Sequence, residues 1–484
     1  MFSWYLLRPL HISWMVAVFC FGVIAGLTAT PHVSVALTGM PWGLVAIGLL
    51  AAGVKNRRVY CIVPVLVAGT IFGLLRGHIY QLELVPYGHS IGKAVVVKGR
   101  VSDDSDVGKR GEIVLRIGEV RMDGHSFGGA VWASVGGKAT IKRGDIVTLR
   151  GKLAEGFGSF AASMYQAELV KVEREVPGDV ALAVRDRFAE SVRRAVPEPE
   201  ASLGVGYVVG QRRSLPEDLD KALRVAGLTH VVVASGYNLT ILVNMARRLF
   251  AKVSKFLATF ISAGTIVAFV AITGMSPSMS RAGLVTGLGL LTWYYGRRFH
   301  PVVLLLLAAA VTALINPAYA RNDLGWQLSF ASFAGVLIVG PLLHNYFYGN
   351  AQPHVLRQVL FETMSAWICT VPLIVLAFGQ FSNVAILANM LVLPLIPLAM
   401  VLTFAAGLLT LVVPALAQVA GFPASLLLGY MTKVTMLLGD MSWAQTTLEV
   451  SWYFVPVYYV TLLVLCGYMW RKTRYDFMER AALE

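Results

Sequence analysis

A cluster of polar residues interrupts an apolar segment near the middle of the chain. Ser235, Gly236, Tyr237 and Asn238 stand inside the run 228–243, whose other residues are mostly aliphatic. Polar groups at bilayer depth are costly, and a Ser-Gly pair weakens a helix where lipid offers the backbone no other hydrogen-bond partner. Two interpretations are open. The segment is either a buried helix with interhelical hydrogen bonds, or part of a water-filled path.

A second candidate is an arginine near membrane depth. Arg281 begins the apolar run 282–295, behind the helix breaker Ser276-Pro277-Ser278. A fixed guanidinium pairs well with phosphate oxygens, so Arg281 is a candidate for contact with a polyanion. The alternative is that it snorkels to the outer interface or caps carbonyls of a neighbouring helix. We predict that a polar path is lined by Ser235, Asn238, Arg281, Gln327, Ser329 and Asn389.

Each uncharged residue in that set can also serve as a simple interhelical hydrogen-bond partner. Other catalytic chemistry has little support in the sequence. The 9 histidines lie far apart along the chain, and the 4 cysteines all fall in apolar segments. The stretch Gly136-Gly137-Lys138 resembles the end of a phosphate-binding loop, but Ala139 follows the lysine and the upstream glycine spacing is wrong. We therefore predict no metal site, no cofactor and no ATPase motif.

The composition identifies the class of protein. Of the 484 residues, 56% are hydrophobic and only 14% are charged, and the mean hydropathy is +0.66. Several runs approach or exceed the roughly 20 apolar residues that cross a bilayer. We predict a polytopic α-helical membrane protein with about 10–12 transmembrane helices. The predicted crossings are 11–28, 41–54, 59–75, 228–246, 256–274, 282–296, 299–315, 327–343, 358–379, 384–413, 416–439 and 451–470.

Basic clusters at the ends of these runs predict the orientation, because cytoplasmic loops carry an excess of Lys and Arg. The cluster 55–58 and the C-terminal Arg471–Arg474 are basic, whereas the loop 29–40 has no Lys or Arg. Both termini should therefore be cytoplasmic, and the protein should lie in the bacterial inner membrane. The segment 86–176 should be extracytoplasmic, and cysteines placed at Ser105 and Ser134 should react with a membrane-impermeant reagent.

The segment 86–176 has the pattern of a small β domain. Strand-like runs separated by Gly and Asp suggest a small β-barrel or sandwich. Its charge is nearly balanced, which is weak support for nucleic-acid binding. Phe157 and Phe160 are the candidates for base stacking, although they can equally pack beneath a loop. The predicted strands are 93–101, 112–122, 129–135, 145–153 and 167–176.

The remaining division of the chain follows from these segments. Residues 1–85 should hold three transmembrane helices, and residues 228–484 should form the main membrane domain. Residues 177–227 connect the β domain to the latter. Apolar positions at helical spacing in 180–196 predict an amphipathic helix on the membrane surface. Leu203–Val209 and the stretch after Pro216 predict two further short helices.

Three motifs in this order resemble those of the ComEC family of competence proteins. His230 followed by Ser235-Gly236 is similar to the family's His-x-x-x-x-Ser-Gly segment. Pro277-Ser278 with Arg281-Ala282 resembles its Pro-Ser-x-x-Arg-Ala motif. Residues 325–330 resemble Gly-Phe-Gln-Leu-Ser-Phe, with Trp326 in place of the usual Phe. The domain order agrees as well, and the β domain is then identified as OB-like.

The resemblance implies transport of single-stranded DNA across the cytoplasmic membrane during natural transformation. It also implies partners: a cytoplasmic helicase-like ATPase that pulls the strand, a periplasmic or surface DNA receptor, and a separate nuclease, besides the membrane lipid. Many family members continue into a metallo-β-lactamase-like nuclease domain. This chain ends at Glu484 without the His-x-His-x-Asp-His cluster of that domain, so we expect a channel and no enzyme.

Two other classes of function are compatible with the residues alone. Broken helices with central polar residues also occur in small-solute secondary transporters, which often have two matching halves. No convincing repeat relates 228–343 to 358–470. A membrane scaffold whose OB-like domain binds envelope proteins is the third possibility.

Overall fold

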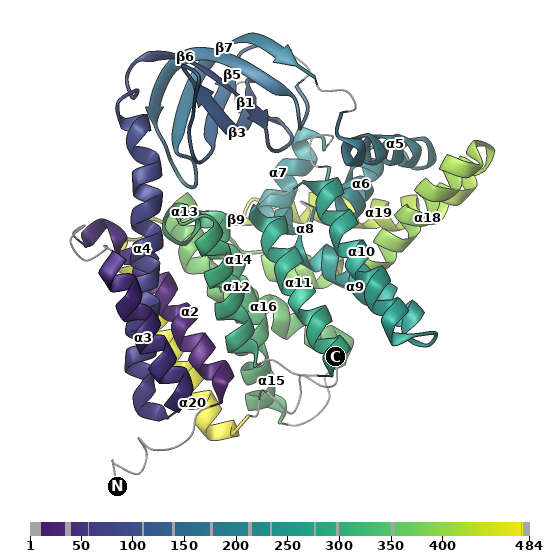
Figure 1. Cartoon of the computed structure of the whole chain (residues 1–484). Coiled ribbons are helices and arrows are strands. Elements are labelled where there is room, and N and C mark those ends of the chain that lie inside the picture. The colour runs from purple at the N-terminus through teal and green to yellow at the C-terminus, as the bar shows by residue number, and fades with distance from the viewer. Residues whose placement is uncertain are drawn as a thin grey trace. The chain divides into compact units, whose positions relative to one another are not determined.

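The computed structural model describes residues 11–33, 40–56, 58–108, 111–137, 141–174, 178–211, 215–232, 235–274, 277–296, 300–349, 354–475 and 477. Within these ranges the chain is mostly helical, with one small β domain (Figure 1). Eight of the described helical segments are long and apolar enough to cross a membrane. The predicted class, a polytopic helical membrane protein with an inserted β domain, is confirmed. The chain forms two compact units, residues 1–179 with 299–327 and residues 180–298 with 328–484.

The first unit begins with helices α2 (Ile12–Ala29), α3 (Met40–Asn56) and α4 (Ile62–Gly88). Glycines at four-residue spacing bring two of them together. A Cβ at Gly22 or Gly26 of α2 would overlap backbone atoms of α4, and a Cβ at Gly69 or Gly73 of α4 would overlap backbone atoms of α2. Small residues at this spacing let two membrane helices approach closely and gain packing that lipid cannot supply.

Helix α4 continues beyond its predicted end at residue 75 and runs into the β domain (Figure 1). Tyr87, near its C-terminus, is 1% exposed and belongs to the hydrophobic core of that domain. Its hydroxyl donates a 2.9 Å hydrogen bond to the Gly128 carbonyl, and its ring contacts Phe127 at 5.1 Å. The helix is therefore anchored in the β domain by a buried aromatic side chain.

The β domain is a closed five-stranded barrel. Its strands are β1 (Ala94–Val101), β3 (Ile113–Met122), β5 (Val131–Val135), β6 (Ile146–Glu155) and β7 (Ala162–Glu173). They pair in the order β1-β6-β7-β5-β3, and β3 returns to β1. All of these pairings are antiparallel except β5 with β7. This order, with one parallel pair, is the topology of an OB-fold.

Two short strands complete this sheet. They are β2 (Asp106–Val107) and β4 (His125–Ser126), and both pair with β3. Asp123 and Gly124, in the turn between β3 and β4, both have positive φ. The last barrel strand was predicted to start at residue 167, which is wrong, because β7 starts at Ala162. Its early part is separated from the rest by Gln166, whose φ of 52° breaks the alternation that the prediction used.

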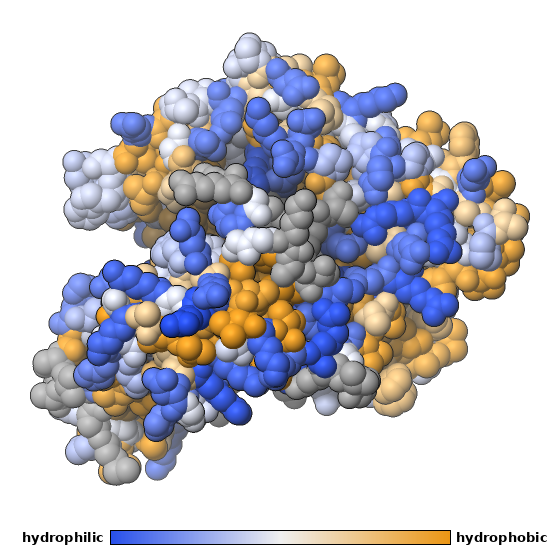
Figure 2. All heavy atoms as spheres, turned by 90° about the horizontal axis from the view of Figure 1, so that it is seen from above, coloured by the Kyte–Doolittle hydropathy of each residue, from blue (hydrophilic) through white to orange (hydrophobic). Residues whose placement is uncertain are grey.

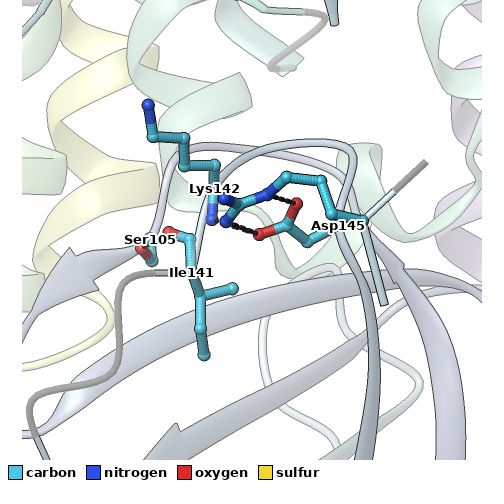
Figure 3. A network of polar contacts seen from close by, with 5 residues as sticks. Ser105, Ile141, Lys142 and Asp145 are labelled. Carbon is cyan, nitrogen blue, oxygen red and sulfur yellow. Dashed lines mark hydrogen bonds and ion pairs between the residues drawn. The ribbon is translucent and has the colours of Figure 1, made fainter. Parts of the chain in front are cut away.

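A polar network fixes the end of the barrel (Figure 3). The Asp145 carboxylate is buried and accepts two 2.9 Å hydrogen bonds from the Arg174 guanidinium, through Nε and Nη2. It also accepts one from the Lys142 N–H at 2.9 Å, and the Ser105 hydroxyl donates to the Ile141 carbonyl at 2.8 Å. The two loops and the end of β7 are thus connected by hydrogen bonds to buried groups.

Two residues chosen as probes from the sequence are inaccessible. Ser105 is 2% exposed and Ser134 is 5% exposed. Ser134 lies on β5, and its hydroxyl accepts a 2.9 Å hydrogen bond from the Gln166 N–H. The expectation that cysteines at these positions would react with a reagent in solution was therefore wrong, because both side chains are buried. Ser126, on the exposed strand β4, is the accessible serine.

The first unit also contains α12 (Pro301–Ile315), α13 (Ala318–Asn322) and the start of α14 (Leu324–Ala334). The C-terminal end of α12 is capped by α4, because Arg76 Nε donates a 3.0 Å hydrogen bond to the Leu314 carbonyl. Helix ends leave carbonyls without partners, and a buried guanidinium supplies donors for them.

In the second unit, helix α5 (Val180–Ala195) packs on the membrane helices α18 (Ile396–Val412) and α19 (Ala417–Gly439). The Ser191 hydroxyl donates to the Gly407 carbonyl, and a Cβ at Gly407 would overlap the ring of Phe188. The side chains of Phe188 and Val192 thus pack against protein, and a place of α5 at the membrane surface stays a prediction. The two further short helices are confirmed as α6 (Glu200–Val209) and α7 (Glu217–Val225).

The other helices of this unit follow the predicted apolar runs, with three interruptions. The run 228–246 is divided between α8 (Thr229–Val232) and α9 (Gly236–Ala251), so it is not one continuous helix. The run 384–413 is broken near Pro394 by a short 3-10 turn between α17 (Ala385–Val392) and α18. A π-helical turn (Gly335–Val339) separates α14 from α15 (Gly340–Tyr348). The uninterrupted helices are α10 (Lys255–Thr273), α11 (Pro277–Tyr295), α16 (Val355–Phe378) and α20 (Phe454–Thr473).

Large apolar surface remains on these helices. Val412, Val419 and Leu426 of the α18–α19 hairpin are 74%, 74% and 69% exposed. Figure 2 shows hydrophobic side chains along the edge where α18 and α19 lie, whereas hydrophilic side chains gather over much of the face toward the viewer. Exposed aliphatic side chains on helices of this length are typical of surfaces in contact with lipid.

The Asp145 network predicts how the barrel responds to mutation and acid. Burial raises the pKa of Asp145, but the hydrogen bonds from Arg174 and the Lys142 N–H outweigh it and leave the pKa below its usual value. The stabilisation is therefore fully present above the unfolded-state pKa of about 3.9 and is lost as the pH falls through the lower folded-state pKa. We expect Asp145→Asn to destabilise the barrel by about 1–3 kcal/mol at pH 7.

Hydrogen exchange of the β6 and β7 peptides in the full chain measures this effect. At pH 7 their protection should fall about tenfold or more in Asp145→Asn, and the difference from wild type should shrink at pH 3 once intrinsic exchange rates are corrected for. Asp123→Asn, in an exposed turn whose positive φ suits asparagine, is the control that should leave protection unchanged. Equal protection of Asp145→Asn and wild type at pH 7 would show that the network is not stabilising.

Candidate functional site

The polar cluster at residue 235 is a helix start. Ser235 has extended backbone angles, φ −120° and ψ 159°, and its hydroxyl accepts a 3.3 Å hydrogen bond from the Asn238 N–H. A serine in this position caps a helix by satisfying one of the first N–H groups. The Ser-Gly pair therefore marks the beginning of α9, and it is not a flexible point inside a longer helix.

Asn238 connects three segments around this helix start. It is 0% exposed, and its Nδ2 donates hydrogen bonds to the Val231 carbonyl at 3.1 Å and the Tyr207 carbonyl at 3.2 Å. Those carbonyls belong to α8 and α6. Carbonyls near a helix break need a partner in a membrane, because water is absent there. The observed contacts agree with the hydrogen-bonding alternative for Asn238, and a place in a wet path stays a prediction for this residue.

Arg281 lies beside the same helix start. A Cβ added at Gly236 would be 3.2 Å from the Cβ of Ala282, so α9 and α11 meet next to Arg281. The Arg281 side chain is 4% exposed, and its guanidinium carbon is 6.0 Å from the centroid of the Phe330 ring, within the range of a cation–π contact. Three sequence motifs, which together span residues 230–330, thus meet at Arg281.

The third motif packs through Trp326, which stands where the motif usually has Phe. The Trp326 indole is buried, and its Nε1 donates a 2.9 Å hydrogen bond to the Thr312 hydroxyl of α12. The backbone N–H of Trp326 donates a 2.6 Å hydrogen bond to the Asp323 carboxylate, which caps the start of α14. The replacement of Phe by Trp at this position therefore adds a hydrogen bond to the packing that a Phe ring would supply.

The other predicted path residues lie in different surroundings. Gln327 is half-buried, and its Nε2 donates to the Arg321 carbonyl at 3.3 Å. Ser329 is half-buried one position before Phe330. Asn389 is 5% exposed, within α17, and donates to the Ala385 carbonyl at 2.7 Å. Asn389 lies beside residues of the core formed by α5–α8 and α17–α19, and its side-chain hydrogen bond stays within α17.

A second candidate site lies on the barrel. Phe157 is 45% exposed, and its ring centroid lies 5.4 Å from that of Trp132 and 5.5 Å from that of Phe160. Tyr165, which is 58% exposed, contacts Trp132 at 5.2 Å. The Arg116 guanidinium carbon lies 5.7 Å from the Phe160 ring centroid. We call these four rings and this arginine the aromatic face of the barrel.

The position of the aromatic face matches the binding surface of OB-folds. Arg116 on β3 is paired in register with Trp132 on β5, and these are the second and third strands of the barrel. Phe157 and Phe160 lie in the loop between β6 and β7, the fourth and fifth strands. Oligonucleotides bind OB-folds on the face of strands two and three and on the loop between strands four and five.

Sequence reasoning identified the two phenylalanines but missed Trp132, Tyr165 and Arg116. The signal for Trp132 was available, because Val131, Ala133 and Val135 alternate toward the core and so place Trp132 outside. Tyr165 could not be found in this way, since the bulge at Gln166 changes the alternation. Arg116 also pairs with the Asp103 carboxylate at 3.2 Å, which reduces the net positive charge of the face.

No group of three or more His, Cys, Asp or Glu side chains that could hold a metal ion occurs in the ranges that the structure describes. Both candidate sites offer groups that can bind a ligand. The site on the barrel consists of exposed aromatic rings beside the Arg116 guanidinium. The site in the membrane domain consists of the buried Arg281 guanidinium among helix ends.

Comparisons with known proteins identify relatives of the membrane domain. The family described as "Competence protein" matches residues 207–473, which is more than half of the chain. ComE operon protein 3 of Bacillus subtilis (strain 168) is 23% identical over 232 residues, covering 48% of this chain. The chain covers 29% of the length of that relative. No solved structure matches. The matched family segment contains all three motifs that meet at Arg281.

Proposed function

Because the chain belongs to the competence protein family, we propose that it conducts single-stranded DNA across the bacterial cytoplasmic membrane during natural transformation. The observation that carries the proposal is the convergence of the three motifs on Arg281, since the matched family segment spans all of them. A polyanion needs a path with sparse positive charge, because each phosphate must bind and then leave. One arginine at a junction of helix ends meets that requirement better than a row of lysines.

The roles of the predicted path residues differ within this proposal. Arg281 contacts phosphate, and Ser329, one position before Phe330, supplies a neutral polar group on the same helix as that ring. Gln327 remains a predicted path residue. Ser235 and Asn238 hold the helix start that positions α9 against Arg281. Asn389 donates to the Ala385 carbonyl within its own helix α17, and contact with the path stays a prediction for it. The path therefore depends on side chains that satisfy backbone groups as well as on those that contact DNA.

The barrel binds the strand before it is transported. Its aromatic face offers rings to which successive bases can stack without regard to sequence, and Arg116 lies at its edge. Movement of the strand requires an external motor, for which a cytoplasmic helicase-like ATPase is the simplest partner. A periplasmic or surface receptor delivers the DNA, and a separate nuclease removes the complementary strand.

Arg281 variants test the proposed path. Arg281→Ala and Arg281→Gln should lower the appearance of DNA in the cytoplasm at least a hundredfold while DNA is still held outside. Arg281→Lys distinguishes a simple charge, which lysine retains, from a two-nitrogen grip on phosphate, which lysine cannot make. Uptake of labelled DNA into a nuclease-protected cytoplasmic pool measures the effect, with the protein level determined in parallel.

Gly287→Ala is a matched control on the same helix, since no atom lies within 4 Å of a Cβ added there. It should leave uptake unchanged. Normal uptake in Arg281→Gln cells with a normal protein level would remove Arg281 from the path. A loss of protein in both Arg281→Ala and Arg281→Gln would mean that the residue is needed for packing only, which also contradicts the proposal.

The aromatic face is tested by binding. Phe157→Ser with Tyr165→Ser should weaken binding of an oligothymidylate by about tenfold or more, because each stacked base contributes about 1–3 kcal/mol. Fluorescence anisotropy with the full chain in nanodiscs measures the affinity. Val96→Ser, which removes an exposed apolar side chain from β1, is the control. Equal affinity of the double variant and wild type would exclude the aromatic face as the site.

The proposed orientation has the barrel outside and both termini in the cytoplasm. In a chain whose four cysteines are replaced by alanine, Ser126→Cys should react with a membrane-impermeant thiol reagent in intact cells. Asn56→Cys, at the exposed end of α3, should react only after lysis. Ser134→Cys should stay unlabelled in both conditions because the side chain is buried. The reverse pattern for Ser126 and Asn56 would invert the topology.

A further inference from the structure

Two cations share one indole ring where helices α9, α10 and α11 come together. The Arg247 guanidinium carbon lies 5.4 Å from the Trp293 ring centroid, and the Lys255 Nζ lies 5.6 Å from the same centroid. Lys255 Nζ is also 5.8 Å from the ring of Tyr294. We call these four residues the cation–aromatic cluster. Arg247, Trp293 and Tyr294 are half-buried, whereas Lys255 is exposed.

The charge of this cluster is not compensated locally. Between Asp220 and Asp323 the sequence contains no acidic residue, so none of the three helices carries a carboxylate. In the part of the chain that the structure describes, no ion pair is formed by Arg247 or Lys255, and Arg248 and Lys252 stand nearby on the same turn. Like charges gathered in this way repel one another and favour the binding of an anion.

The cluster lies on the helices that carry the motifs, at their other ends. Helix α9 starts at the Ser235 cap and reaches Arg247 near its end, and α11 carries Arg281 in its second turn and Trp293 in its last. At 1.5 Å per residue, Arg281 and Trp293 are separated by about 18 Å along the helix axis. A strand that passes Arg281 and follows α11 therefore comes next to the cluster.

We propose that Arg247, Lys255, Trp293 and Tyr294 form a second binding site for single-stranded DNA, which holds the strand where it leaves the membrane domain. This inference rests on the proposed function. The two cations bind backbone phosphates, and the rings of Trp293 and Tyr294 stack with bases. Rings and cations in alternation are what sequence-independent binding of a single strand requires.

Anionic lipid is the other source of phosphate at such a position, because basic and aromatic residues also gather at membrane interfaces. Two observations favour DNA. Arg247 is half-buried against the indole instead of extending outward, and the cluster occupies the same two helices as the motif junction. A lipid headgroup would be served equally well by the exposed Arg248 and Lys252, which have no recorded ring contact.

The test compares two double variants with the same change of charge. Arg247→Gln with Lys255→Gln should reduce DNA uptake at least tenfold, whereas Arg248→Gln with Lys252→Gln should leave it within about twofold of wild type. Both proteins should keep normal levels and the Ser126→Cys labelling pattern. A photoreactive phenylalanine analogue at Trp293 should crosslink to DNA that is arrested during uptake.

The outcomes separate this site from the proposed function. If uptake depends on Arg281 but is equally reduced, or equally normal, in the two double variants, and residue 293 gives no crosslink, the cluster is not a DNA site. If uptake is normal but the Arg247/Lys255 variant copurifies with less cardiolipin, the cluster is a lipid site and the inference is overturned. If Arg281 variants also take up DNA normally, the proposed function itself fails.

Discussion

The membrane requires every backbone N–H and C=O within it to have a partner in the protein, and this requirement explains how the helix breaks are built. At Ser235 the chain leaves helical geometry, and the freed groups are satisfied by the Ser235 hydroxyl and by the Asn238 amide. The Asn238 amide also reaches the Tyr207 carbonyl, so the break is joined to α6 as well as to α8. The start of α9 lies against Ala282 of α11, next to Arg281.

The β domain combines a hydrophobic interior with an outer face of aromatic side chains. Alternation along β5 places Val131, Ala133 and Val135 inside and leaves Trp132 outside. Closure of the barrel brings β3, β5 and β7 next to one another, so the outward rings and Arg116 form one face. The Asp145 network includes none of the residues of this face. It holds loop ends and the last strand together, and so maintains the closure on which the face depends.

Charge is distributed along the chain in a way that suits a polyanion. The long interval without an acidic residue, from Lys221 to Asn322, includes α9, α10, α11 and α12, and it contains both Arg281 and the cation–aromatic cluster. Positive charge in this interval is sparse and placed beside aromatic rings, at Phe330 and at Trp293. Rings lower the cost of keeping a cation away from water without neutralising it, as a carboxylate would.

The sequence by itself determined the class, the small β domain at 86–176 and the three motifs that identify the family, because each of these depends on hydropathy, alternation or local spacing. It could not show that Asn238 donates to the Tyr207 and Val231 carbonyls, or that Asn389 donates within its own helix. The spacing of residues along the chain does not identify hydrogen-bond partners. It placed Ser105 and Ser134 in an exposed domain but could not tell that both side chains are buried by their neighbours. The aromatic face and the contact of two cations with Trp293 were decided by tertiary structure alone, because they arise only when strands from a closed barrel, or ends of three helices, are brought side by side.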